Sequence, residues 1–109
     1  MTPEAAGSTP ASRAARAPRL FVVARRDLPV GLRTAQVGHA IAEWVLAHGA
    51  PPDNLVVLVV PDRAALEAVV ARVSGRVVAF REPDLDDEVT AVAVGPEHWR
   101  ALSSLPLLR

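Results

Sequence analysis

The feature that most constrains the fold is a series of four short apolar runs, each bounded by charged residues, proline or glycine. The runs are rich in valine and cover residues 20–24, 55–60, 77–80 and 90–94. Apolar runs of this length are typical of strands, and a nearly continuous run is typical of a strand buried on both faces. The chain is therefore expected to build a four-stranded sheet.

Helical spacing separates the first three runs. Apolar residues recur at intervals of three and four over residues 32–48, and Gly49 is a typical helix stop. A second helix is expected after Asp62, which is a favoured capping residue. Its apolar face is expected to consist of Leu66, Val69, Val70 and Val73. Pro96 is expected to begin a short last helix, because proline is favoured in the first helical turn.

The order of elements is therefore β-α-β-α-β-β-α. Strands joined through a helix are expected to run parallel, whereas the last two strands, joined only by an acidic loop over residues 82–88, are expected to be antiparallel. A chain of 109 residues supports one domain. The predicted fold class is α/β, a single domain with a mixed four-stranded sheet and helices packed on it.

Residues 1–18 differ from the rest of the chain. They hold three prolines and no valine, leucine, isoleucine or aromatic residue, so they are predicted to be a disordered N-terminal extension before a domain over residues 19–109. No apolar core of a secretory signal is present. An organelle transit peptide is the alternative, because this segment carries two arginines, Arg13 and Arg16, and one acidic residue, Glu4. The absence of lysine favours the extension, because it is typical of a GC-rich bacterial genome.

Composition excludes several classes of site. The chain has no cysteine, which excludes disulfides, thiolate zinc sites and a cysteine nucleophile. Its longest apolar run, residues 55–60, is far shorter than the roughly 20 residues of a membrane helix. A formal net charge of zero gives no overall attraction for nucleic acid, so any RNA site must be a local patch. A cytoplasmic domain without a metal or cofactor is expected.

Polar side chains follow the first and third expected strands. Ligands of open α/β sheets bind beyond the carboxyl ends of the strands, so a site is expected where residues 25–39 meet the turn over residues 82–84. Gln36 and His39 are three residues apart and share one side of the helix. His39 can act as a base or bind a group from solvent. The alternative is a packed histidine that donates a hydrogen bond to a backbone carbonyl.

Two charged clusters flank this position. Arg25, Arg26 and Arg33 form a basic cluster that suits phosphate, although solvated chain ends are the alternative interpretation. The acidic run over residues 82–88 lacks calcium-loop spacing, and no second histidine lies at zinc spacing. We interpret this run as a solvated loop. Asp84 stands apart within it, because Pro83 precedes it and a strand ends just before.

Two motifs follow one another at the first junction. Residues 20–28 read Leu-Phe-Val-Val-Ala-Arg-Arg-Asp-Leu, and Gly31 precedes Ala-Gln-Val-Gly-His-Ala at residues 35–40. Together they resemble the strand, Asp-Leu, glycine and Ala-Gln-x-x-His-Ala signature of the type-2 peptidyl-tRNA hydrolase family. The last strand with its following Gly95 and Pro96 is similar to that family's closing Gly-Pro. The resemblance covers nearly the whole expected domain and agrees with the family's mixed four-stranded sheet.

The chain departs from the family pattern at two places. The family usually carries a lysine just before its Ala-Ala-Gln, where this chain has Leu32 and Arg33. The family's Asp-Ala-Gly-Arg-Thr-Gln loop is reduced here to residues 82–87, in which Asp84 matches the aspartate and the arginine and threonine have no counterpart. Thr90 lies too late in the chain to replace that threonine.

The resemblance implies a hydrolase that cleaves the ester between a peptide and the 3′ end of tRNA with an activated water. His39 would be the general base or a proton relay, and Asp84 would orient it or the water. Gln36 would help to position the scissile carbonyl. Arg25, Arg26 and Arg33 would contact tRNA phosphates, and no cofactor is implied.

Two alternatives stay open. A catalytically reduced family member would keep the fold as an RNA- or protein-binding module, and a related enzyme would act on another ester or amide. A homodimer is also a hypothesis, because Trp44, Trp99 and residues 105–108 are large apolar residues that can bury against a partner.

Overall fold

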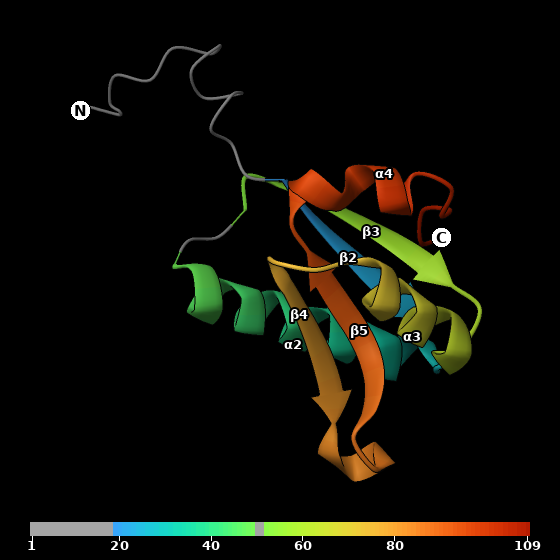
Figure 1. The fold of residues 1–109 in the computed structure, drawn as a ribbon. Coiled ribbons are helices and arrows are strands. Elements are labelled where there is room, and N and C mark those ends of the chain that lie inside the picture. Colours follow the sequence, from blue (N-terminus) through green and yellow to red (C-terminus); the bar gives the residue numbers. More distant parts are fainter. Residues whose placement is uncertain (1–18, 50–51) are drawn as a thin grey trace, which may run out of the picture.

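The predicted order of strands and helices is present in the computed structural model, which describes residues 19–49 and 52–109. The prediction for residues 1–18 lies outside the described residues. Figure 1 shows a four-stranded sheet with helices on both faces, so the predicted α/β class is confirmed. In chain order the elements are β2 (Arg19–Arg25), α2 (Val30–His48), β3 (Asn54–Val60), α3 (Arg63–Arg72), β4 (Val77–Glu82), η1 (Pro83–Leu85), β5 (Glu88–Val94), η2 (Pro96–His98) and α4 (Trp99–Leu102).

The strand order in the sheet is β3-β2-β5-β4. β2 and β3 pair in parallel, and β5 pairs antiparallel with both β2 and β4. The predicted directions are therefore confirmed. Because β2, β3 and β4 run the same way, their carboxyl ends lie at one edge of the sheet, where ligands of α/β folds bind.

The two faces of the sheet bury different side chains. Alternate residues of β2 point to opposite faces, so Leu20 and Val22 pack toward α2, while Phe21 and Val23 pack toward α3 and α4. All of these residues are buried, as expected for a central strand covered on both faces. Figure 1 shows α2 on one side of the sheet and α3 on the other. This arrangement presents one side of α2 directly to β4 and β5.

The capping residue of α3 was predicted correctly. Asp62 precedes the helix, and its carboxylate accepts a hydrogen bond from the backbone N–H of Ala65 at 3.0 Å. Asp62→Ala is expected to lower the free energy of unfolding by about 1 kcal/mol, because that N–H loses its partner. Denaturant unfolding measures the change. Asp53→Ala is the control, since Asp53 is also exposed and makes no side-chain hydrogen bond within the described residues; equal losses would contradict the assignment.

The strands around the acidic segment are longer than predicted. β4 continues to Glu82 and β5 begins at Glu88, so both ends of the predicted 82–88 loop belong to strands. Only a single 3₁₀ turn and two residues with positive φ, Asp86 and Asp87, connect them. The expectation of a solvated loop over the whole run is therefore wrong at its ends, because backbone pairing in the β4–β5 hairpin extends further than the apolar pattern.

Three of the residues considered for a dimer surface make contacts inside the chain. Trp44 is 3% exposed and packs in the α2 face of the core. Leu107 forms an antiparallel bridge to Leu58, and the N–H of Leu108 donates to the carbonyl of Val57, so the C-terminal residues line the free edge of β3. Trp99 and Leu107 both stay half exposed, at 50% and 51%. Trp44 therefore does not belong to the surface invoked for a dimer, whereas Trp99 and Leu107 remain on it, and the homodimer stays a prediction.

Candidate functional site

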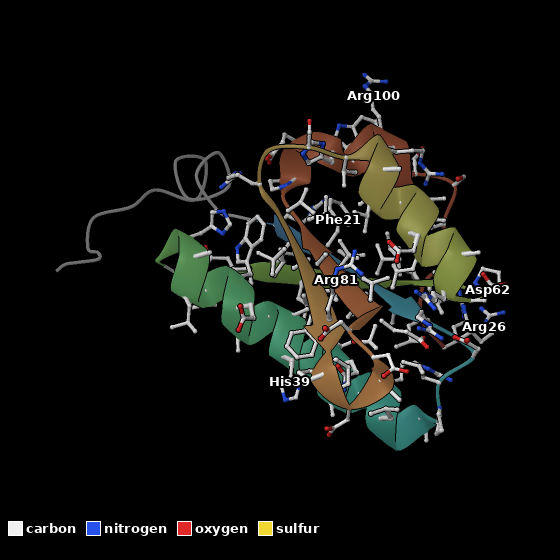
Figure 2. All side chains as sticks on the ribbon, turned by 60° about the horizontal axis from the view of Figure 1, so that its bottom comes forward. Phe21, Arg26, His39, Asp62, Arg81 and Arg100 are labelled. Atoms are coloured by element: carbon white, nitrogen blue, oxygen red, sulfur yellow. The ribbon has the colours of Figure 1, made fainter. Side chains whose placement is uncertain are left out.

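Helix α2 meets the carboxyl end of β4 through two successive contacts. The side-chain amide Nε2 of Gln36 donates to Oε1 of Glu82 at 2.8 Å, and the ring of His39 lies on that of Phe80 with centroids 4.8 Å apart. Gln36 and His39 are neighbours on one helix face, and Phe80 and Glu82 are neighbours on one strand face. The two segments predicted to form a site therefore do meet. Figure 2 shows His39 close to the turn between β4 and β5.

The amide of Gln36 is buried and fixed in orientation. Gln36 is 1% exposed, and its oxygen accepts a hydrogen bond from the hydroxyl of Thr90 at 2.7 Å. A carboxylate only accepts hydrogen bonds, so the NH₂ group must face Glu82. The amide oxygen then faces Thr90, whose hydroxyl must be the donor. Gln36 therefore acts on Glu82, and it is too deeply buried to hold a substrate carbonyl as the resemblance implied.

Thr90 reaches Gln36 because β5 carries a bulge. Phe80 pairs with Ala91 and Arg81 pairs with Val89, which leaves Thr90 without an opposite residue. A bulge adds one residue and re-aims a side chain, and here it turns the Thr90 hydroxyl toward α2. Thr90 is fully buried. Thr90 was set aside because it lies too late in the chain to replace the family's threonine, and the alternation of residues along β5 does not reveal the bulge that brings it to α2.

Thr90→Val tests this contact, because valine keeps the shape of threonine and removes its hydroxyl. The buried amide oxygen of Gln36 would lose its donor, so the free energy of unfolding is expected to fall by about 1–3 kcal/mol. Thermal or denaturant unfolding measures the loss. Thr34→Val is the matched control, since the exposed Thr34 hydroxyl bonds only to the Val30 carbonyl of its own helix. A Thr90→Val protein as stable as that control would contradict the assigned bond.

Two N–H groups hold the carboxylate of Glu82. The Gln36 amide binds Oε1, and the backbone N–H of Asp84 lies 3.3 Å from Oε2. These bonds, in that order of importance, lower the pKa of Glu82 below its ordinary value of 4.5, and the nearby His39 adds a smaller effect in the same direction. Partial burial opposes the shift. Glu82 is therefore a firmly ionised group and a weak base.

His39 lies on the solvent side of the same helix face. Its ring is tilted by 49° against Phe80, and it is exposed. Within residues 19–49 and 52–109, neither ring nitrogen makes a hydrogen bond, which differs from the packed-histidine alternative. The aromatic contact positions the ring, while the residue as a whole is exposed. This is the arrangement that a proton-transfer group requires.

Asp84 occupies a different position from the one expected of the site's carboxylate. It lies in η1 and is exposed, and its contribution to the contacts above is its backbone N–H. The carboxylate that faces α2 belongs to Glu82, two residues after Phe80. The period of two along the strand could have indicated this, since residues 78, 80 and 82 share one face.

The basic cluster is largely engaged inside the protein. Arg25 is 5% exposed, and its guanidinium binds Asp27 through two bonds of 3.0 and 2.8 Å and Glu88 through one of 2.7 Å. Arg33 donates to the backbone carbonyls of Arg26 and Leu28. The exposed member of the cluster is Arg26. Of the three arginines expected to contact phosphates, Arg26 is therefore the exposed one. Arg25 and Arg33 instead hold the loop that carries Arg26.

Further findings bear on the class of site. Among the described residues, no three histidine, aspartate or glutamate side chains lie close enough to hold a metal ion. In the same part of the chain, the helices are too short or too polar to cross a membrane. No protein-family model matches the chain, and no curated protein matches it either.

Proposed function

We propose that the protein is a hydrolase that cleaves the ester between a peptide and the 3′ end of tRNA. The observation that carries this proposal is that the glutamine and the histidine of the Ala-Gln-x-x-His motif point in different directions. Gln36 points inward and binds the Glu82 carboxylate, whereas His39, one turn later, faces solvent beside the same strand. An ionised carboxylate, an accessible imidazole and a rigid support are the parts that activation of water requires.

The chemistry follows from these groups. A ring nitrogen of His39 takes a proton from water while the water oxygen bonds to the ester carbonyl carbon. The bond from this carbon to the ribose oxygen then breaks, and the proton passes from His39 to that oxygen. The products are tRNA with a free hydroxyl and a peptide with a free carboxylic acid, which becomes a carboxylate by releasing the second proton of the water to solvent. Imidazole suits both transfers because it exchanges protons near neutral pH.

The same edge of the sheet supplies a contact for the nucleic acid. Arg26 follows β2 at its carboxyl end and is exposed, and guanidinium pairs well with phosphate. Phosphate contacts fix the position of a nucleic acid without reading its sequence. Asp84, Asp86 and Asp87 lie exposed at the turn and oppose a wider contact. Binding is therefore proposed to involve few phosphates and a shallow dependence on salt.

Hydrolysis in oxygen-18 water tests the function. Purified protein is incubated with tRNA that carries an N-blocked peptide, and the products are analysed by mass spectrometry. The expected result is a released peptide with one oxygen-18 atom in its carboxylate, together with tRNA that can be charged again. Peptide release no faster than in buffer would overturn the proposal. Release without oxygen-18 would indicate transfer to another acceptor and would overturn it as well.

A second candidate is a binding module that keeps the fold without catalysis. The internal engagement of Arg25 and Arg33 favours it, because a peptidyl-tRNA enzyme needs free cations for its substrate. The two candidates differ in one measurement. Binding of peptidyl-tRNA with no release of peptide would support the module, whereas release with repeated turnover would support the hydrolase.

A further inference from the structure

We propose that Glu82, rather than Asp84, is the carboxylate that works with His39, and that Gln36 and Thr90 form a relay that positions it. This inference rests on the proposed hydrolysis and goes further by assigning roles within the site. Glu82 is a catalytic residue in this assignment because it holds the attacking water. Gln36 and Thr90 are positioning residues because they act through Glu82.

The register of β4 favours Glu82 over Asp84. Phe80 and Glu82 point to the same face of the strand, and the His39 ring packs on Phe80 at 4.8 Å. His39 and Glu82 therefore lie on the same side of the contact between α2 and β4. Pro83 starts the 3₁₀ turn immediately after Glu82. Asp84 therefore lies beyond the contact between α2 and β4, in the exposed turn.

The hydrogen bonds of the relay all run in one direction. The Thr90 hydroxyl donates to the Gln36 oxygen, and the Gln36 amide donates to Oε1 of Glu82. Bonds aligned in this way strengthen one another in a buried position. The bulge in β5 fixes the starting point of the relay, since it alone places the Thr90 hydroxyl against α2. The end point is a carboxylate with a fixed position and a fixed charge.

The carboxylate retains capacity for a water molecule. Two carboxylate oxygens offer about four acceptor positions, of which Gln36 and the N–H of Asp84 take two. Water can donate one hydrogen to Glu82 and the other to a ring nitrogen of His39. The bonds from Gln36 and Asp84 make Glu82 a weak base, so the proton goes to His39. Glu82 stays ionised throughout, orients the water and stabilises the imidazolium that forms.

A matched pair of variants tests the assignment. Glu82→Gln keeps the shape and still accepts a bond from Gln36, and it is expected to lower kcat by about 100-fold with KM within about twofold. Asp84→Asn removes the same charge two residues later and is expected to lower kcat by at most about threefold. Asp86→Asn, on the same turn, controls for the loss of one negative charge. Circular dichroism confirms that all three variants are folded.

The relay has its own test. Thr90→Ser keeps the hydroxyl and is expected to retain most of kcat, whereas Thr90→Val is expected to lower kcat about tenfold. A carboxyl-carbon NMR titration supplies a readout independent of turnover. The pKa of Glu82 lies below 4.5 in the wild type and is expected to rise in Gln36→Leu, which removes the first hydrogen bond.

The outcomes separate the inference from the function. An active wild type with Glu82→Gln equally active would overturn the role of Glu82 and leave the hydrolysis standing. An active wild type in which Asp84→Asn has the larger loss would return the role to Asp84. Equal kcat values in Thr90→Ser and Thr90→Val would overturn the relay. A wild type without activity would overturn the hydrolysis itself, and with it the catalytic role of Glu82.

Discussion

Replacing His39 by alanine is expected to lower kcat for peptidyl-tRNA hydrolysis by about 10²–10⁴-fold, the usual contribution of a positioned acid–base group. The variant leaves Glu82 and its hydrogen bonds in place but has no group to accept the proton. The loss should appear in kcat, because His39 acts in the transition state. Measurement of initial rates over a range of substrate concentrations separates kcat from KM.

The matched control is His48→Ala. His48 lies at the far end of α2, where its ring stacks on Trp44 with centroids 3.9 Å apart. This variant is expected to keep kcat within about twofold of the wild type. His39 is exposed and makes no hydrogen bond within the described residues, so His39→Ala should also unfold close to the wild-type temperature. Equal activities of His39→Ala and the wild type would remove His39 from the mechanism.

The largest expected effect on stability is that of Arg25→Met. Methionine keeps the apolar length of arginine but leaves Asp27 and Glu88 without their buried partner. Removal of one member of a fully buried ion pair costs about 3–5 kcal/mol. The side chains of Asp27 and Glu88 are 40% and 29% exposed, so solvent reduces the loss. We therefore expect the free energy of unfolding to fall by about 2–3 kcal/mol.

Denaturant unfolding at neutral pH measures this loss. Arg81→Met is the control, because Arg81 forms an exposed ion pair with Glu67 at 3.4 Å and should lose no more than about 1 kcal/mol. Arg25→Met and Arg81→Met proteins of equal stability would contradict the structural role of Arg25. Such a result would also make Arg25 a candidate for contacting phosphate again.

The effect of Arg25→Met should depend on pH. The bonds from Arg25 hold the pKa of Asp27 below its ordinary value of 3.8. A lowered pKa in the folded state gives stability that is present above 3.8 and is lost as the pH falls through the lowered value. Wild type and variant should therefore differ most near neutral pH, and the difference should shrink as the pH falls below 3.8 and through the lowered pKa. A constant difference across this range would indicate that packing of the arginine stem, not its charge, is responsible.

The sequence was sufficient to predict the elements and their order. Valine-rich runs identified the four strands of the sheet within the described residues, and Gly49 ended α2 with a φ of 83° in the left-handed region, as expected of a glycine stop. The limits of the elements were less accurate. α2 begins at Val30, directly after Pro29, which is two residues earlier than its apolar spacing indicated. Proline supplies a φ suited to the position before the first turn, and this effect does not depend on hydrophobicity.

The location of the site was predictable, but the partners within it were not. The rule for strand ends identified the meeting of Gln36 and His39 with the end of β4. Thr90 entered the site through a bulge, and a bulge depends on the register between two strands. Arg25 is not available as a member of the basic cluster because its guanidinium binds Glu88 on β5, which lies 63 positions away in the chain. Such pairings depend on the tertiary fold and leave no local pattern.

The joint action of His39 and Glu82 on one water molecule is the step on which the proposed function depends. It is tested most directly by kcat for peptidyl-tRNA hydrolysis by the wild type, His39→Ala, Glu82→Gln and the double variant. We expect a double variant about as slow as the slower single variant, because the two residues serve the same step and that step can be lost only once. A double variant slowed by the product of the two single losses would contradict it, since the residues would then act independently.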